Sequence, residues 1–161
     1  MPIIDWKPYQ SRHPSEQELE EWFSNGSQNN VGIVCGSVSK NLYVLDIDDP
    51  ALLNEKPIAA IADKTVLVRT SRGLHIYLRS LVPARLTHRP SYHLDLIGDG
   101  GLVVAPPSTH PSGCKYEFAT DVREILEVED VNKIIEWLDQ KYGYHVPSGP
   151  PMMVSSQVEH N

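Results

Sequence analysis

One short segment, residues 42–48, most constrains the fold, because an apolar run of strand length ends in two aspartates. It reads Leu-Tyr-Val-Leu-Asp-Ile-Asp, rich in the branched and aromatic side chains that favour a buried strand. Side chains alternate along a strand, so Asp46 and Asp48 point to one face, with Cα atoms about 7 Å apart. The segment therefore indicates a strand with a carboxylate-bearing face and an opposite core face, formed by Tyr43, Leu45 and Ile47.

The rest of the chain predicts the order helix, two strands, helix, mostly strands, helix. Ser15 and Glu18 form a capping box for a helix that runs to Phe23, and Asp49-Pro50 begins a second helix over about 51–62. A final helix covers about 131–142, with Asp130 as its cap. Further strands are expected at 31–35, 42–47, 65–69, 74–79, 92–97 and 102–105, with 115–118 as another candidate. This order favours an α+β fold with a mixed or antiparallel sheet.

Composition indicates one soluble globular unit, since 40% of the 161 residues are hydrophobic. Proline, glycine and serine increase after Tyr142, so we expect one domain over residues 1–142 and a flexible tail or linker over 143–161. No segment approaches the roughly 20 apolar residues of a membrane span. The start of the chain lacks a signal-peptide pattern, and two cysteines give no disulfide framework. We therefore expect a cytoplasmic protein without a membrane partner.

Charge is distributed unevenly along the chain. The net charge of -7 is unlike that of most nucleic-acid-binding proteins. Between Lys64 and Leu94, however, there is no Asp or Glu. That stretch contains the following basic residues and histidines: Lys64, Arg69, Arg72, Arg79, Arg85, Arg89, His75, His88 and His93. It predicts a local phosphate-binding face, and the alternative is a solvated surface that happens to lack acids.

The aspartates suggest a metal site. Two neighbouring carboxylates repel each other unless a cation lies between them, and oxygen ligands suit Mg²⁺ or Mn²⁺. Asp95 lies within the strand predicted at 92–97 and becomes a third ligand if that strand lies beside the Asp46 strand. Two alternatives remain open. Asp48 and Asp49 can simply cap the helix that begins at Pro50, and Asp95 can pair with an arginine.

Two loops carry candidate phosphate ligands. His75 follows Ser71-Arg72-Gly73, whose backbone amides and guanidinium can bind a triphosphate. A lone histidine is otherwise more often structural. Pro106-Pro107 forms a stiff loop that can present Ser108 and His110, or it simply ends the preceding strand. The chain contains no Gly-x-x-x-x-Gly-Lys-Ser/Thr motif, which excludes an ATPase phosphate loop.

Taken together, these segments resemble the primase–polymerase catalytic domain of the archaeo-eukaryotic primase superfamily, of the type found in archaeal plasmids, viruses and phages. The matching segments occur in the family's order between about Trp6 and Tyr116. They are residues 30–36, 44–48, 70–77 and 93–108. The resemblance implies a small αβ unit packed on a sheet like that of RNA-recognition domains, with the active site in the cleft between these two subdomains.

The resemblance also implies residue roles. Asp46, Asp48 and Asp95 would be the catalytic ligands of Mg²⁺ or Mn²⁺. His75, with the turn Ser71, Arg72 and Gly73, would contact the incoming triphosphate, and Ser108 or His110 would lie near it. The template strand would follow the basic stretch, with Tyr77 or Trp6 as stacking surfaces and with the arginines Arg69, Arg79, Arg85 and Arg89.

The implied activity is template-directed nucleotidyl transfer by a DNA primase or polymerase through a two-metal mechanism. Its partners would be nucleoside triphosphates and a single-stranded DNA template with a primer, and a helicase or further domains of a longer protein are candidates. Two other functions use the same features. A metal-dependent phosphohydrolase or nuclease would use water as the nucleophile, and a replication-initiation module would bind nucleotide without catalysis.

Overall fold

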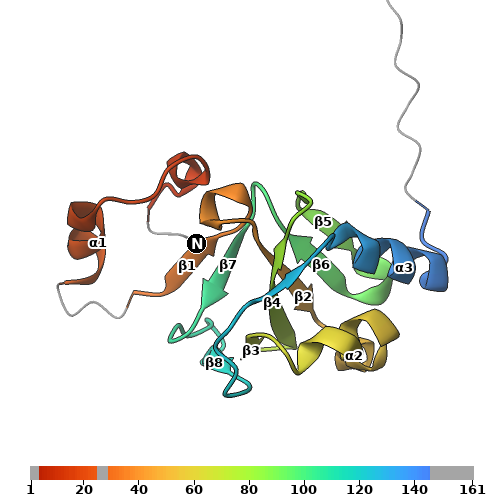
Figure 1. Cartoon of the computed structure of the whole chain (residues 1–161). Helices are drawn as coiled ribbons and strands as arrows, with labels where there is room; N and C mark the ends of the chain where they lie inside the picture. Colours follow the sequence, from red (N-terminus) through yellow and green to blue (C-terminus); the bar gives the residue numbers. More distant parts are fainter. Residues whose placement is uncertain (1–3, 25–28, 146–161) are drawn as a thin grey trace, which may run out of the picture.

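The computed structural model describes residues 4–24 and 29–145, and it shows an α+β fold, as predicted (Figure 1). The tail predicted at 143–161 lies mostly outside the described residues, and the predicted division at residue 142 stays a prediction. The helices are α1 (Glu16–Phe23), α2 (Lys56–Ala62) and α3 (Asn132–Tyr142), with short 3-10 turns η1 (Lys7–Gln10), η2 (Ser37–Ser39), η3 (Pro50–Asn54) and η4 (Pro90–Tyr92). The strands are β1 (Val31–Val34), β2 (Leu42–Ile47), β3 (Leu67–Arg69), β4 (Leu74–Ser80), β5 (Thr87–Arg89), β6 (Leu94–Ile97), β7 (Leu102–Ala105), β8 (Glu117–Phe118) and β9 (Leu126–Val128).

A seven-stranded mixed sheet organises the domain. Its order is β5-β6-β2-β4-β3-β8, and β9 pairs with β4. The β9–β4 pair is parallel, whereas the other neighbours are antiparallel. β2, the segment with the two aspartates at its end, lies in the interior between β6 and β4. β1 and β7 form a separate antiparallel two-stranded ribbon.

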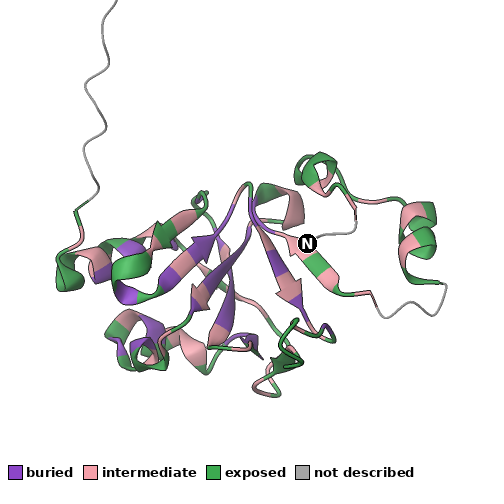
Figure 2. Cartoon of the chain, turned by 180° about the vertical axis from the view of Figure 1, so that it is seen from behind, coloured by how far each residue is buried: buried purple, intermediate pink, exposed green. Residues whose placement is uncertain are grey.

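The two faces of the main sheet pack against different partners. Tyr43, Leu45 and Ile47 are fully buried in a core that includes Ile58 of α2 and Leu138 of α3. The opposite face packs against the ribbon in a second cluster, whose members include Leu42, Val44, Tyr77 and Val103. Helices α2 and α3 lie on one side of the main sheet, and the ribbon and α1 lie on the other (Figure 1). Burial is concentrated in the main sheet and its helices, and α1 contains no buried residue (Figure 2).

Several predicted elements form as expected. Ser15 and Glu18 form the capping box of α1, and the Asp49 carboxylate accepts the Ala51 N–H at 2.9 Å. Strands β2 and β7 have the predicted bounds. The N-cap of α3 is Val131 rather than the predicted Asp130, whose carboxylate nevertheless accepts the Asn132 N–H at 2.9 Å.

Other predictions are corrected by the structure. The single helix predicted over 51–62 is divided into η3 and α2, because Pro57 has no N–H and its ring excludes an uninterrupted helix. The strand predicted to begin at Tyr92 begins at Leu94, after η4 and a left-handed His93 with φ 55°. Strands β6 and β7 flank the glycine-rich turn Gly98-Asp99-Gly100-Gly101, which the sequence predicts, but they belong to different sheets. The chain there crosses from the main sheet to the ribbon, where Gly101 O accepts the Cys35 N–H at 3.0 Å.

Within the described ranges, no helix is both long and apolar enough to cross a bilayer.

Asp139 of α3 connects the helix to the β5 edge of the sheet. Its carboxylate accepts hydrogen bonds from Arg89 Nε at 2.7 Å, Arg89 Nη2 at 2.9 Å and the Tyr92 hydroxyl at 2.7 Å. The Arg89 and Asp139 side chains are only 12% and 16% exposed. Burial favours the neutral acid, but the hydrogen bonds from Arg89 and Tyr92 outweigh it and hold the pKa of Asp139 below its usual value.

Replacing Asp139 with alanine will lower the free energy of unfolding by about 3 kcal/mol at pH 7, because a largely buried guanidinium loses its partner. The stabilisation from a carboxylate of lowered pKa is complete above the unfolded pKa, near about 3.9, and is lost as pH falls through the folded pKa. The difference in the free energy of unfolding between wild type and variant will therefore shrink progressively as pH falls below about 3.9. Urea unfolding at pH 7 and at pH 3 measures this difference. The control is Asp121→Ala, because Asp121 is exposed. An equal difference at pH 7 and pH 3 would contradict this account.

Candidate active site

Four polar side chains form a row across one face of the main sheet. His88 of β5 pairs with Asp95 of β6, Asp95 pairs with Asp46 of β2, and Asp46 pairs with His75 of β4. Directly opposite residues of an antiparallel pair project to the same face. The Asp–His row, as we name these four residues, therefore places two carboxylates side by side and a histidine at each end. It lies on the ribbon side of the sheet, in line with Val44 and Tyr77 on their strands.

His75 is the buried end of the row. Its Nε2 lies 3.4 Å from Asp46 Oδ1, and its side chain is 7% exposed, against 34% for Asp46. Its ring contacts Tyr77 and Tyr116, with centroids 6.4 and 6.1 Å away. Within the described residues, His75 Nδ1 and the Tyr77 hydroxyl are buried and have no hydrogen-bond partner. The packed rings fix the imidazole, so it orients the Asp46 carboxylate.

Asp95 and His88 form the open end of the row. His88 Nδ1 lies 3.0 Å from Asp95 Oδ2, and the two side chains are 60% and 37% exposed. Asp95 therefore pairs with His88, and not with an arginine as the alternative proposed. Asp95 contacts a histidine, and Asp46 faces it from the neighbouring strand.

The turn before β4 brings an arginine to Asp48. Arg72 Nη2 lies 3.3 Å from Asp48 Oδ2, and the Arg72 side chain is 77% exposed. Thr70 Oγ1 accepts the N–H groups of Arg72 and Gly73 at 3.3 and 3.0 Å, so these two amides already have a partner. A Cβ at Gly73 would lie 1.8 Å from Ile47 O, so only glycine lets the turn pack against the end of β2.

Asp49, rather than Asp48, caps the element that begins at Pro50. The capping alternative therefore accounts for Asp49 alone. Asp48 directs its carboxylate to the turn, and its own N–H donates to His93 O at 3.0 Å.

Ser108 and His110 differ in their surroundings. Ser108 is 3% exposed, and its hydroxyl accepts the Val31 N–H at 2.8 Å, so it joins its loop to β1. His110 is partly exposed, and its Nδ1 lies 2.8 Å from Ser112 Oγ. Its ring lies 6.5 Å from that of Tyr116, which in turn contacts His75. His110 is thus linked to the Asp–His row through one aromatic side chain, whereas Ser108 has a structural role.

The four predicted template arginines do not gather beside the row. Arg69 and Arg89 pair with Leu74 and Leu94, which alternate with His75 and Asp95 and so face away from it. Arg79 donates to the carbonyls of η2 and its C-cap, and Arg85 is exposed. Template binding through these residues stays a prediction.

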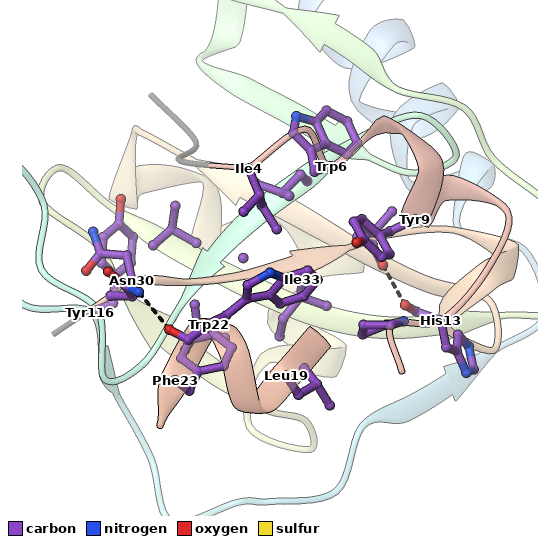
Figure 3. Close-up of a pocket in the computed structure, with 18 of the residues that line it drawn as sticks. Ile4, Trp6, Tyr9, His13, Leu19, Trp22, Phe23, Asn30, Ile33 and Tyr116 are labelled. Carbon is purple, nitrogen blue, oxygen red and sulfur yellow. Dashed lines mark hydrogen bonds between the residues drawn. The ribbon is translucent and has the colours of Figure 1, made fainter. Parts of the chain in front are cut away.

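The two aromatic stacking candidates also differ. Tyr77 is 4% exposed and is therefore excluded as a stacking surface for a template base. Trp6 lines a cavity of about 590 Å³ between the ribbon, η1 and α1 (Figure 3). Aromatic and aliphatic residues dominate its wall, including Tyr9, Leu19, Trp22 and Phe23.

That cavity is poorly suited to a phosphate chain. Helix α1, which forms one wall, carries four glutamates, and the nearby Arg12 is already paired with Glu18 at 2.7 Å. The Tyr9 hydroxyl also donates to Glu18 at 2.7 Å. Most residues that line the cavity are apolar, and apolar side chains offer no donors to phosphate oxygens. The cavity touches the candidate site only at its edge, through His110 and Tyr116.

The side chains of the candidate site offer carboxylate and imidazole groups as possible ligands for a divalent cation. Among the described residues, no group of three His, Cys, Asp or Glu side chains is arranged to hold a metal ion. Mg²⁺, however, is commonly bound through one or two carboxylates and completes its shell with water and substrate phosphates. Asp46 and Asp95 face each other in register, and both carboxylates are partly exposed and so can accept a cation that keeps water ligands. These residues fit an oxygen-ligated cation.

His88 and Tyr116 join the site without having been singled out from the sequence as site residues. The only signal for His88 was its place in the basic stretch, because prolines on both sides of β5 concealed the strand. Tyr116 follows a loop whose path the sequence pattern does not predict. Only strand pairing and loop packing bring these two side chains to the row.

The fold and the row together define an α+β domain with a carboxylate-rich sheet face. The chain belongs to the bifunctional DNA primase/polymerase N-terminal domain family, which it matches over residues 1–133. This confirms the resemblance drawn from the sequence and gives a primase/polymerase function at the level of the family, with nucleotide and DNA substrates. The family generally uses divalent metals. A comparison with curated proteins found no match.

Replacing Gly73 with alanine will separate the Arg72 turn from Asp48, because the new Cβ meets the backbone of β2. We expect a loss of at least about 2 kcal/mol in the free energy of unfolding, measured with urea. Gly100→Ala is the matched control, since φ is 84° but no atom lies within 4 Å of its added Cβ. The left-handed backbone at residue 100 will by itself lower the free energy of unfolding of Gly100→Ala by about 1 kcal/mol. Equal losses in both variants would contradict the close-packing explanation.

Proposed function

We propose that this domain is a template-directed nucleotidyltransferase that joins nucleoside triphosphates on a single-stranded DNA template. The observation that carries the proposal is the register of the central strands, in which Asp46 lies between Asp95 and His75. Two adjacent carboxylates with a fixed imidazole form a site suited to phosphoryl transfer, and membership of the family supplies the substrate class.

Asp46, Asp48 and Asp95 are the proposed ligands of Mg²⁺ or Mn²⁺. A bound divalent cation would lower the pKa of the attacking 3′-hydroxyl and offset charge on the triphosphate. The chain's own residues prepare this site in two ways. His75 holds one oxygen of Asp46, and the paired strands keep Asp46 and Asp95 adjacent before any substrate binds. A preformed site of this kind needs little reorganisation during the reaction.

The triphosphate is proposed to lie beside the turn formed by Ser71, Arg72 and Gly73. Arg72 is highly exposed, and within the described residues its guanidinium forms one ion pair, a 3.3 Å contact with Asp48, so it can turn toward phosphate oxygens. Arginine binds phosphate through paired hydrogen bonds. The rings of His75 and His110 have centroids 6.1 and 6.5 Å from that of Tyr116, and we propose that both contact the same nucleotide.

A phosphohydrolase or nuclease would use the same carboxylates with water as the nucleophile. The family match favours nucleotidyl transfer, since chain growth with pyrophosphate release is the reaction of a primase or polymerase. Primer extension with simultaneous detection of pyrophosphate distinguishes the reactions. Strand shortening in the absence of extension would overturn the proposal.

Asp46→Asn will reduce the rate of primer extension with Mg²⁺ or Mn²⁺ by about 100-fold or more, because one charged oxygen at the reacting phosphate is lost. Asp63→Asn is the control, since Asp63 is exposed at the end of α2. The assay uses a labelled primer on a DNA template and resolves products by length. Extension by Asp46→Asn at the wild-type rate would remove Asp46 from the mechanism.

Arg72→Ala will raise the KM for the nucleoside triphosphate about tenfold or more while changing kcat little, because a charge-assisted hydrogen bond to phosphate contributes about 1.5–3 kcal/mol. Arg72→Lys will recover part of the loss, since it restores charge without the paired geometry. Steady-state extension at varied nucleotide concentration separates the two constants. An unchanged KM in Arg72→Ala would place the triphosphate elsewhere.

A further inference from the structure

His88 occupies an unusual position at the open end of the Asp–His row. It lies on β5, a three-residue edge strand, and its imidazole is 60% exposed. Its Nδ1 lies 3.0 Å from Asp95 Oδ2, and within the described residues no other polar partner of this ring is present. An exposed side chain of this kind adds little to the core. Its one specific contact is with a carboxylate of the candidate site.

The fold holds His88 in place from the opposite face of β5. Alternation along the strand puts Arg89 on the helix side, where it donates to Asp139 at 2.7 and 2.9 Å and lies 4.2 Å from the Tyr144 ring centre. Pairing with β6 sets the register in which His88 is opposite Asp95. The short strand is thus clamped to α3 on one side, so the imidazole is presented to Asp95 on the other.

This contact determines which oxygen of Asp95 is available. If His88 Nδ1–H donates to Oδ2, the carboxylate cannot rotate freely, and Oδ1 is the oxygen left for another ligand. Asp95 faces Asp46 directly across the β2–β6 pair. Carboxylates that bind metals are commonly hydrogen-bonded by outer groups, which fix their orientation. At the other end of the row, His75 makes the corresponding contact with Asp46 Oδ1.

We propose that His88 is a positioning residue, which holds Asp95 by a hydrogen bond so that the free carboxylate oxygen is presented beside Asp46 to a divalent cation. The proposal rests on the proposed function, since it needs Asp95 to be a metal ligand. His88 itself does not bind the cation. Its role depends on an N–H donor at the Nδ1 position, and not on an imidazole lone pair.

The test is Mn²⁺ binding to the whole chain without DNA or nucleotide, followed by the electron paramagnetic resonance signal of free Mn²⁺. Loss of an outer-shell partner weakens metal affinity by about 10–100-fold, and we expect this loss for His88→Ala. His88→Asn will bind close to wild type, because the asparagine Nδ2 can donate from the position of Nδ1. Thr87→Ala is the matched control on the same strand, since Thr87 alternates with His88 and faces away from the row.

The outcomes separate the two proposals. If wild type binds no Mn²⁺, or if Asp95→Ala binds it as tightly as wild type, the proposed metal site fails. If Asp95→Ala weakens binding but His88→Ala does not, the metal site stands and the role of His88 is overturned. If His88→Asn binds as weakly as His88→Ala, the imidazole itself is required and the positioning role is also overturned. Thermal unfolding without metal checks that each variant is folded.

Discussion

The pairing of β2 with β4 and β6 is the constraint on which the rest of the structure depends. β2 supplies Tyr43, Leu45 and Ile47 to the helix-side core, so its register cannot slip by one residue without exposing them. The same register puts Asp46 opposite both Asp95 and His75. Apolar burial on one face therefore fixes the polar row on the other. Two carboxylates can be held together because the core, rather than their own interaction, determines their positions.

Neighbouring side chains then add their own supports to the row. At one end, packed tyrosine rings hold His75 against Asp46. At the other end, the Arg89–Asp139 ion pair anchors β5 so that His88 contacts Asp95. The turn at residues 71–73 brings Arg72 to Asp48 because Gly73 packs against the β2 backbone. The tyrosine rings act on the same face of the sheet as the row, whereas the ion pair acts from the opposite face of β5.

The cavity beside α1 and the Asp–His row differ in their polar groups. The cavity is lined mainly by aromatic and aliphatic residues, and its Arg12 is already paired with Glu18, so it is a poor place for phosphate. The Asp–His row has two partly exposed carboxylates, and the exposed Arg72 contacts Asp48 just beyond the end of β2. In the proposed function, an acidic protein acts on nucleotides through a small local site, in which a cation and a few donors would offset the negative charge. The overall net charge of -7 says little about that site.

Sequence alone determined the α+β class, the strand at residues 42–47, the capping box of α1 and the family, because these depend on local periodicity and on motifs in order. It also marked Asp46, Asp95 and His75 as a possible group. The tertiary structure decided which side chains meet. It showed that β6 and β7 separate into two sheets, that Tyr77 is buried, and that His88 and Tyr116 reach the row. Such contacts join residues distant in the chain, and strand register, which packing sets, is not written in any short segment.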